Sequence, residues 1–319
     1  MIAITGSHGF VGKRLMDFAS LEHIPFQAIA RENYLRVQAY EGCEVVIHLA
    51  GLAHRKSATL VDFMQINCEL ALNCARTAAQ AGVKRFIYVS SSKALRNFAE
   101  NAQPLKESEV AAPGCDYGHS KLAAEKALLE LHREGVFEVV IVRPALVIGS
   151  PAKANLKTLA HVARLTTRFP VSLRLARWVF SSFELPKSYT SLENLCSALV
   201  CVARSRAGTE GIFHVVEDQA ISTSSLFNRL VDAGMALSQN IQPTSPSYDH
   251  RHSRLLQSLL KHALTFIGFQ NVFQALANPL VLDGTRIQIE LNWKPQAHID
   301  AELQRIMANL PSLDERSKG

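Results

Sequence analysis

Residues 1–12, MIAITGSHGFVG, decide the fold of this chain. An apolar run, Ile2 to Thr5, is followed at once by the spacing G-x-x-G-x-x-G at Gly6, Gly9 and Gly12, and then by a helical pattern. Glycine permits a tight turn between strand and helix and lets backbone N–H groups approach a pyrophosphate at the helix N-terminus. Such a turn can also be purely structural, but its place in the first strand-to-helix connection favours a dinucleotide site.

Outward from this turn, short apolar runs alternate with helical patterns, as in a parallel sheet covered by helices. Helices are expected from Phe63 to Ala81 and from Tyr117 to Leu131, and a later strand from Ile212 to Val216. We therefore predict an α/β fold, a Rossmann-type doubly wound parallel sheet with a smaller C-terminal substrate lobe. The other expected strands are Ile2 to Thr5, Pro25 to Ala30, Glu44 to Leu49, Arg85 to Ser90 and Phe137 to Arg143.

This pattern divides the chain into two parts. Residues 1–148 are expected to form the dinucleotide-binding domain, with a returning segment near residues 188–204. Residues 149–319, where the pattern becomes irregular, are expected to form mainly the substrate-binding lobe.

The composition excludes several classes of protein. The formal net charge of +6 comes from cations spread along the chain without a dense basic run, so we expect no nucleic-acid partner. The six cysteines show no C-x-x-C pair and no histidine at zinc spacing, so no metal site is expected. The chain opens without the regions of a signal peptide, and its longest apolar-rich stretch, Leu255 to Leu276, falls short of a clean bilayer span. We therefore expect a cytoplasmic protein with no transmembrane segment.

Three residue types with acid/base chemistry occur at suggestive positions. Tyr117 and Lys121 stand at i and i+4 of an expected helix and so share a face. The ammonium group favours ionisation of a phenol whose ordinary pKa is about 10. Ser92 follows the strand that ends at Ser90, at the sheet edge where ligands of open α/β sheets bind. A bare Y-x-x-x-K carries little information, so its value depends on the other motifs.

Together these motifs resemble the extended short-chain dehydrogenase/reductase family, and within it the nucleotide-sugar 4-epimerases and 4-ketoreductases of surface-polysaccharide synthesis. Asn67, Ser92 and Tyr117 fall at equal intervals (92 − 67 = 25 and 117 − 92 = 25), as in the sugar 4-epimerases. The resemblance spans nearly the whole chain. It is carried by Thr5 to Gly12, Ile47-His48-Leu49-Ala50-Gly51, Asn67, Ser90-Ser91-Ser92, Tyr117-Gly118-His119-Ser120-Lys121, Arg143-Pro144-Ala145-Leu146-Val147 and Glu290-Leu291-Asn292-Trp293-Lys294-Pro295.

The resemblance implies a role for each matching residue. Tyr117 would be the acid/base at a sugar hydroxyl or keto oxygen, which Ser92 would hydrogen-bond. Lys121 would bind the nicotinamide ribose and lower the pKa of Tyr117, and Asn67 would help to hold the site together. The implied substrate-binding residues are Ser92, Asn155, Leu156 and Lys187, and the implied cofactor-binding residues are Gly6, His8, Gly9, Phe10, Val11, Gly12, Arg31, Leu49, Ala50, Gly51, Tyr117, Lys121 and Pro144.

The chain also departs from the family's pattern. Only Arg31 to Gly42 separate the second strand from the next, enough for a short helix and no further strand, so the usual third strand and its adenine-binding Asp should be missing. Arg31 stands where an acidic residue would read the ribose of NAD, and this favours NADP(H) over NAD(H). Asp283 and Arg286 would take the place of the arginine and acidic residue with which the family's sugar epimerases commonly bind the diphosphate and ribose.

Three readings of the function stay open. Lys93-Ala94 replaces the Asp-Glu pair of the family's dehydratases, which excludes 4,6-dehydration and leaves 4-keto reduction slightly ahead of 4-epimerisation. A cofactor-binding sensor or scaffold that has lost catalysis is the competing class. The family also implies a homodimer through the helices Phe63 to Ala81 and Tyr117 to Leu131.

Overall fold

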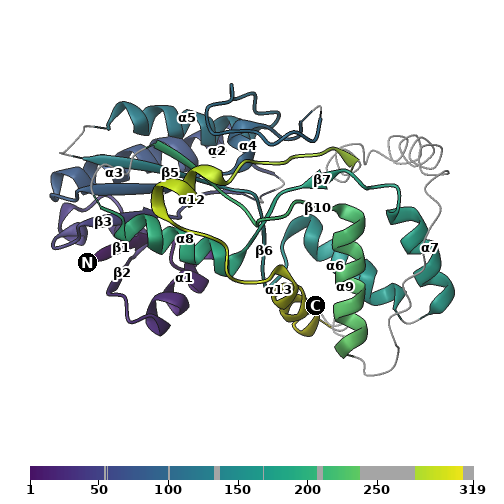
Figure 1. Ribbon diagram of the computed structural model, residues 1–319. Coiled ribbons are helices and arrows are strands. Elements are labelled where there is room, and N and C mark those ends of the chain that lie inside the picture. Colours follow the sequence, from purple (N-terminus) through teal and green to yellow (C-terminus); the bar gives the residue numbers. More distant parts are fainter. Residues whose placement is uncertain are drawn as a thin grey trace.

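The structure is a computed structural model that describes residues 1–53, 55, 57–99, 101–132, 137–167, 169–206, 211–237 and 277–311. Its centre is a six-stranded parallel sheet in the order β2-β1-β3-β4-β5-β9 (Figure 1). The predicted α/β fold with a parallel sheet is confirmed. The strands are β1 (Ile2–Thr5), β2 (Phe26–Ile29), β3 (Val45–His48), β4 (Arg85–Val89), β5 (Glu138–Pro144) and β9 (Gly211–Val215).

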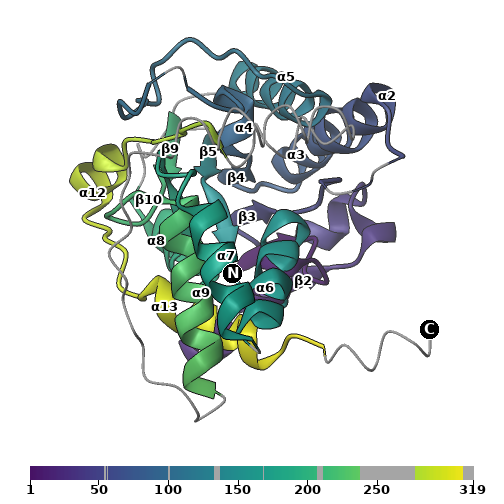
Figure 2. The same ribbon diagram turned by 90° about the vertical axis from the view of Figure 1, so that its right-hand side faces the viewer.

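Helices cover both faces of this sheet (Figure 2). Side chains alternate along β1, so Ile2 and Ile4 pack on one face with Leu15 of α1, while Ala3 packs on the other with Ala75 of α3. The first face is covered by α1 (Phe10–Leu21) and α8 (Leu192–Arg204), and the second by α3 (Leu70–Gln80) and α5 (Asp116–Glu130). The strand order reverses between β1 and β3, which places the ligand crevice of such sheets above their carboxyl ends.

The sheet ends at β2, as the short spacing predicted. Residues 30–44, all of which are described, contain two short 3₁₀ helices, η1 (Arg31–Asn33) and η2 (Val37–Tyr40), and no strand. The predicted helix from Phe63 is also interrupted: α2 (Leu60–Met64) and α3 are joined by a π-helical turn, η3 (Gln65–Glu69). π-Helical turns often occur at functional sites, and this one carries Asn67.

The helices at residues 154–166, 170–180, 223–237 and 299–308 form a second lobe with its own apolar core. The predicted strand near Ile212 is β9, which belongs to the main sheet instead. The predicted stretch Leu255 to Leu276 lies outside the described residues, and no helix in the described part is long and apolar enough to span a bilayer. The elements outside the main sheet layers are α4 (Ser92–Leu95), β6 (Leu146–Ile148), α6 (Ala154–Thr166), α7 (Pro170–Phe180), β7 (Pro186–Lys187), β8 (Tyr189–Ser191), β10 (Ile221–Ser222), α9 (Thr223–Leu237), α12 (Thr285–Leu291) and α13 (Ile299–Ala308).

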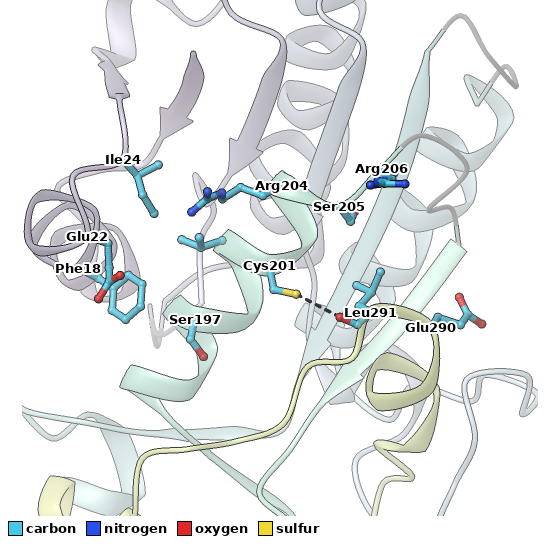
Figure 3. Close-up of a pocket in the computed structure, with 11 residues that line it drawn as sticks. Phe18, Glu22, Ile24, Ser197, Cys201, Arg204, Ser205, Arg206, Glu290 and Leu291 are labelled. Atoms are coloured by element: carbon cyan, nitrogen blue, oxygen red, sulfur yellow. Dashed lines mark hydrogen bonds between the residues drawn. The ribbon is translucent and has the colours of Figure 1, made fainter.

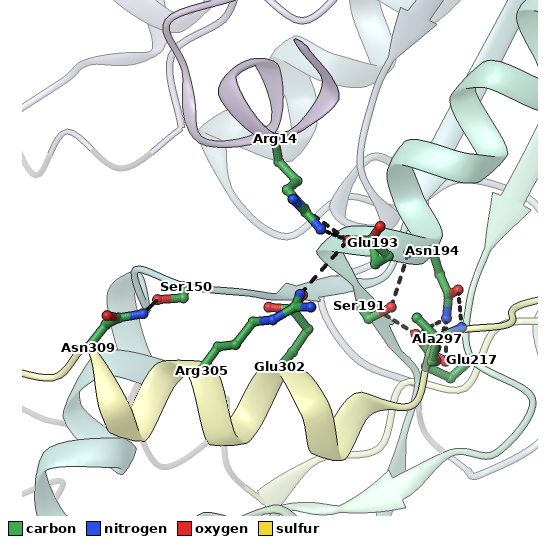
Figure 4. A network of polar contacts seen from close by, with 10 residues as sticks. All are labelled: Arg14, Ser150, Ser191, Glu193, Asn194, Glu217, Ala297, Glu302, Arg305 and Asn309. Atoms are coloured by element: carbon green, nitrogen blue, oxygen red, sulfur yellow. Dashed lines mark hydrogen bonds and ion pairs between the residues drawn. The ribbon is translucent and has the colours of Figure 1, made fainter. Parts of the chain in front are cut away.

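A polar network ties the last helix of the lobe to the sheet domain (Figure 4). Arg14 on α1 forms an ion pair with Glu193 on α8, and Arg305 of α13 lies 3.9 Å from the same carboxylate. Arg305 also donates to the buried Glu302 at 2.7 Å. Both lobes are thus joined on the side of α1 and α8, away from α3 and α5.

Candidate active site

The glycine turn leads from β1 into α1 and leaves no space for side chains at two positions. A Cβ on Gly6, whose φ is +75°, would lie 2.6 Å from the backbone nitrogen of Ala50. A Cβ on Gly12 would lie 2.2 Å from the Gly6 carbonyl oxygen. The turn therefore packs directly against the end of β3, which brings Leu49 and Ala50 to the edge of the crevice.

The first turn of α1 is suited to an anion. Gly9 is the N-cap residue and offers no side chain to accept from the first N–H groups, and the first turn contains no acidic residue. Those N–H groups carry the positive end of the helix dipole, so the pyrophosphate of a dinucleotide fits here. His8 is exposed beside the turn, and Phe10 lies close to Gly149, where an added Cβ would meet its ring at 3.1 Å.

The loop after β3 forms the next wall of the crevice. The Asn67 side chain accepts from the backbone N–H of Leu52 at 2.7 Å and donates to the Leu52 carbonyl and to the Ser120 hydroxyl, both at 3.0 Å. A Cβ on Gly51 would lie 3.0 Å from Asn67 Oδ1 and 3.5 Å from Lys121 Nζ. Asn67 Oδ1 and Lys121 Nζ thus both lie close to Gly51, and a side chain on Gly51 would be tight against Asn67.

Tyr117 stands in the first turn of α5 with Lys121 one turn later. The Tyr117 phenol forms a hydrogen bond with the Ser91 hydroxyl, which lowers its pKa, but burial raises that pKa more strongly, to about 12. The phenol is therefore protonated at neutral pH and able to give a proton to an oxygen. The expected lowering of its pKa by Lys121 is not among the causes of this shift.

The ammonium group of Lys121 is buried. Its Nζ donates to the Val89 carbonyl at 2.9 Å and lies 4.4 Å from the centre of the Tyr88 ring. Burial lowers the Lys121 pKa to about 7, while the nearby carboxylate of Glu125 opposes that change. Tyr88 in turn donates to the Asn67 carbonyl at 2.9 Å, so Lys121 and Asn67 share one neighbour.

Glu125 lies one further turn along α5 and was missed by sequence reasoning. It accepts from Arg143 Nε at 2.9 Å and Nη2 at 2.6 Å, and from the Ser90 hydroxyl at 2.5 Å. The two charged side chains are 1% and 3% exposed, so this ion pair is buried beneath Lys121. The i, i+4, i+8 spacing of Tyr117, Lys121 and Glu125 could have indicated it.

The structure distinguishes the two serines that follow β4. Ser92 is buried at the first residue of α4, whereas Ser91 is half-buried and hydrogen-bonds Tyr117. The Ser91 hydroxyl also accepts from the Lys93 backbone N–H at 3.2 Å. Ser91 is therefore a second candidate, besides Ser92, for the hydroxyl that would hydrogen-bond the reacting oxygen.

The adenosine end of the crevice contains a residue that the sequence analysis did not single out. The buried Tyr34 follows η1, and its hydroxyl accepts from the Gly6 backbone N–H at 2.7 Å. Tyr40 fixes Tyr34 in turn by donating to its carbonyl oxygen at 2.8 Å. Arg31 is exposed at the first residue of η1. Burial raises the pKa of the Tyr34 phenol, and the charge of Arg31 opposes that change. Tyr34 thus connects the abbreviated sheet edge to the glycine turn.

The predicted substrate residues lie on separate elements. Asn155 is exposed in the first turn of α6, while the Leu156 side chain packs in the core of the second lobe. Lys187 ends β7, where burial lowers its pKa to about 8.

Pro144, one of the predicted cofactor residues, ends β5 beside Val215. Arg286 donates to the Ile212 carbonyl at 3.0 Å and to Glu290 at 2.7 Å, which ties α12 to the edge strand.

Two hollows in the described part of the chain lie at the opposite end of the strands. A cavity of about 850 Å³ is lined by Phe18, Ile24, Cys201 and Leu291 (Figure 3). A second, of about 960 Å³, reaches residues at the amino ends of β1, β3 and β4. Ligands of open parallel sheets bind at the carboxyl ends of the strands, where neither of these two hollows lies. We therefore locate the candidate site by its hydrogen bonds and by the glycine turn. In the described part of the chain, no group of three His, Cys, Asp or Glu side chains is placed to hold a metal ion.

Comparison with known proteins agrees with this geometry. Residues 2–213 match the sequence model of the family described as NAD dependent epimerase/dehydratase. The chain is 29% identical over 255 residues to a UDP-glucose 4-epimerase of Vibrio cholerae, covering 73% of this chain and 75% of that protein. It is 27% identical over 241 residues to a GDP-6-deoxy-D-mannose reductase of Pseudomonas aeruginosa, covering 72% and 78%.

A solved structure shares the fold over almost the full length. RMD from Pseudomonas aeruginosa, solved in complex with NADPH, superposes with a TM-score of 0.67 at 22% identity. The match covers 97% of this chain and 98% of that chain. Both lobes therefore belong to one known architecture.

Proposed function

The chain belongs to the NAD dependent epimerase/dehydratase family, and from that premise we propose that it is an NAD(P)-dependent enzyme acting at C4 of a nucleotide-activated sugar. The proposed reaction is reduction of a 4-keto group to a hydroxyl. The proposed setting is the cytoplasmic synthesis of precursors for a surface polysaccharide or O-antigen. Residues 1–148, with the returning segment 188–204, are assigned to cofactor binding, and residues 149–319 mainly to substrate binding.

When bound, the nicotinamide supplies the hydride that C4 receives. Tyr117 gives the proton that O4 receives, and Ser92 or Ser91 holds that oxygen by a hydrogen bond. Lys121 binds the nicotinamide ribose beside Gly51, and Asn67 fixes the loop after β3 through Leu52. In the second lobe, Asn155 and Lys187 contact the nucleotide diphosphate, to which a lysine offers a point charge and no bidentate fork.

The observation that carries the choice of reduction is the abbreviated edge of the sheet. An epimerase has to retain its cofactor through oxidation, rotation of the 4-keto sugar and re-reduction, so a firm grip on adenosine is useful to it. A reductase has to release the spent cofactor in every cycle. The sheet ends at β2, and exposed turns replace the third strand, which favours exchange of the cofactor.

Epimerisation at C4 is the second candidate. It is supported by the equal spacing of Asn67, Ser92 and Tyr117 and by the similarity to the UDP-glucose 4-epimerase. The two reactions use the same proton donor and differ in whether the hydride returns to the same sugar. Arg31 favours NADPH, the usual reductant, and so supports reduction.

The deciding experiment is cofactor stoichiometry with a panel of UDP-, GDP- and dTDP-sugars and their 4-keto forms. Consumption of one NAD(P)H for each sugar converted supports the reductase. Inversion at C4 with catalytic cofactor and no net change in nicotinamide absorbance assigns the epimerase. Measurable NAD(P) binding with no hydride transfer to or from any substrate assigns the sensor or scaffold class.

A homodimer through the outer faces of α2, η3, α3 and α5 is part of the proposal. Leu122 and Ala123 of α5 are half-buried, so this helix keeps some apolar surface exposed. Sedimentation at micromolar concentration tests it, and a monomer would contradict it.

A further inference from the structure

Helix α7 presents apolar side chains on two opposite faces. Its inner face packs into the core of the second lobe, where the Phe180 ring stacks on Phe227 of α9 with ring centres 4.1 Å apart. Its outer face carries Val171, Leu175 and Trp178, which are 79%, 59% and 41% exposed. These three positions follow the helical repeat and form one stripe.

Two more large apolar side chains are exposed just before α7. Phe169, directly before the helix, is 66% exposed, and Leu165 at the end of α6 is 43% exposed. The helix lies at the end of the lobe furthest from the sheet in Figure 1 and faces the viewer in Figure 2. Several large exposed apolar side chains on and beside one helix are typical of an interaction surface.

The sequence stretch that contains α7 carries only cationic charges. From Pro151 to Phe183 the sequence contains no Asp or Glu. Arg174 is exposed within the apolar stripe, and Arg177 lies beside it in an ion pair with Asp232 of α9. The cations of this stretch are Lys153, Lys157, Arg164, Arg168, Arg174 and Arg177.

We propose that the outer face of α7 binds the surface of an anionic phospholipid bilayer. Large apolar side chains together with Trp and Arg are the composition of helices that lie in the interface of a membrane. Trp178 would sit at the level of the headgroups, and Val171 and Leu175 would enter the acyl boundary. Arg174 would face the anionic headgroups, so the second lobe would contact the bilayer while the sheet domain stays in water.

The charge argues against a second copy of the chain as the occupant. A symmetric contact through α7 would place the same cation-rich surface on both sides. Like charges at close range oppose such an association, whereas an anionic surface attracts them. The proposal does not depend on the reaction proposed above.

The test is binding of the full chain to vesicles of phosphatidylcholine with and without about one third phosphatidylglycerol. The chain should sediment with the anionic vesicles only, and the bound fraction should fall with added salt because screening weakens surface attraction. Trp178 and Trp293 are the two tryptophans, and Trp293 is 6% exposed, so a blue shift of emission on binding reports Trp178.

Variants on the helix separate the apolar and charged contributions. Val171→Ser with Leu175→Ser should lower the partition coefficient about tenfold or more, because two apolar side chains no longer enter the bilayer. Arg174→Gln should lower it about fivefold. The matched control is Val110→Ser with Ile289→Ser, which are 80% and 75% exposed on other elements and should leave binding unchanged.

Several results would overturn the proposal. These are no vesicle binding, equal binding to neutral vesicles, or binding that the α7 variants leave intact. Protection of Trp178 from acrylamide quenching before vesicles are added would show that the chain itself covers the face. Self-association that is abolished by the Val171→Ser, Leu175→Ser variant would assign the face to a second copy.

Discussion

The residues at the two ends of the proposed cofactor site are held in different ways. At the nicotinamide end, Asn67, Lys121 and Glu125 are buried, and their polar groups are bonded to other elements of the fold. At the proposed adenosine end, two 3₁₀ helices replace a strand, and Tyr34 accepts a hydrogen bond from the Gly6 backbone N–H of the glycine turn. In the proposed site, buried polar bonds fix the reacting end more firmly than the end that would recognise adenosine. Changes at the first end should alter catalysis and folding, and changes at the second should alter cofactor affinity.

The largest effect is expected at Tyr117. Tyr117→Phe removes the transferable proton and leaves the glycine turn intact, so turnover should fall by about 10²- to 10⁴-fold with little change in cofactor affinity. Steady-state rates and a fluorescence titration with NAD(P)H measure the two quantities. Retention of more than about a tenth of the wild-type rate, far above that range, would remove Tyr117 from the acid/base role.

The buried ion pair beneath Lys121 should give the second largest effect, on stability. Glu125→Gln leaves the Arg143 charge buried without its partner, which should lower the free energy of unfolding by about 3–5 kcal/mol. Urea denaturation measures this. Glu130→Gln, at an exposed position of the same helix, is the control and should cost little.

A double variant tests the reason for that loss. Glu125→Leu with Arg143→Met removes both charges and should be more stable than Glu125→Gln alone, because no unpaired charge stays buried. If the double variant were less stable than the single one, the loss would come from packing and not from the charge.

The sequence spacing singled out Asn67, Tyr117 and Lys121 but missed their buried neighbour Glu125, and it showed the missing third strand only as a gap. Glycine turns and the i, i+4 pair of Tyr117 and Lys121 depend on local geometry, which spacing records. The partners depend on tertiary placement: Gly6 and Tyr34 are 28 residues apart, and Arg143 reaches back to Glu125 across 18. These distances along the chain leave no periodic pattern.

Sequence spacing also could not show which of Ser91 and Ser92 faces the Tyr117 phenol. The equal intervals of 25 residues indicate Ser92, yet the Tyr117 phenol hydrogen-bonds Ser91. Which hydroxyl faces the phenol depends on where β4 ends and α4 begins, and a shift of one residue along extended backbone turns a side chain to the other face.

Replacing Tyr34 tests whether the proposed adenosine end is held independently of the nicotinamide end. Tyr34→Phe leaves the Gly6 N–H without its acceptor, at a cost of about 1–3 kcal/mol, and should weaken NADH and NADPH binding about tenfold. Reduced nicotinamide mononucleotide, which lacks the adenosine half, should bind the variant as it binds the wild type. Calorimetric titration with both ligands checks this. An equal loss for the mononucleotide would mean that Tyr34 supports the whole site and not one end of it.

Arg31 should give the smallest effect, and its size tests how lightly the adenosine end is held. The side chain is exposed, so its attraction to a ribose 2′-phosphate is screened by salt, in contrast to the buried charges at the other end. Arg31→Gln should therefore weaken NADPH about threefold to tenfold and leave NADH unchanged, because only NADPH carries the additional phosphate. Arg36→Gln, exposed five residues later (36 − 31 = 5) between the same two 3₁₀ helices, is the matched control for a loss of general positive charge. Dissociation constants for both cofactors, measured at low and at physiological salt, separate the two causes. If both variants weaken NADPH equally, the loop acts through its net charge. If Arg31→Gln affects NADH as much as NADPH, the residue does not read the 2′-phosphate, and the preference for NADP(H) loses its support.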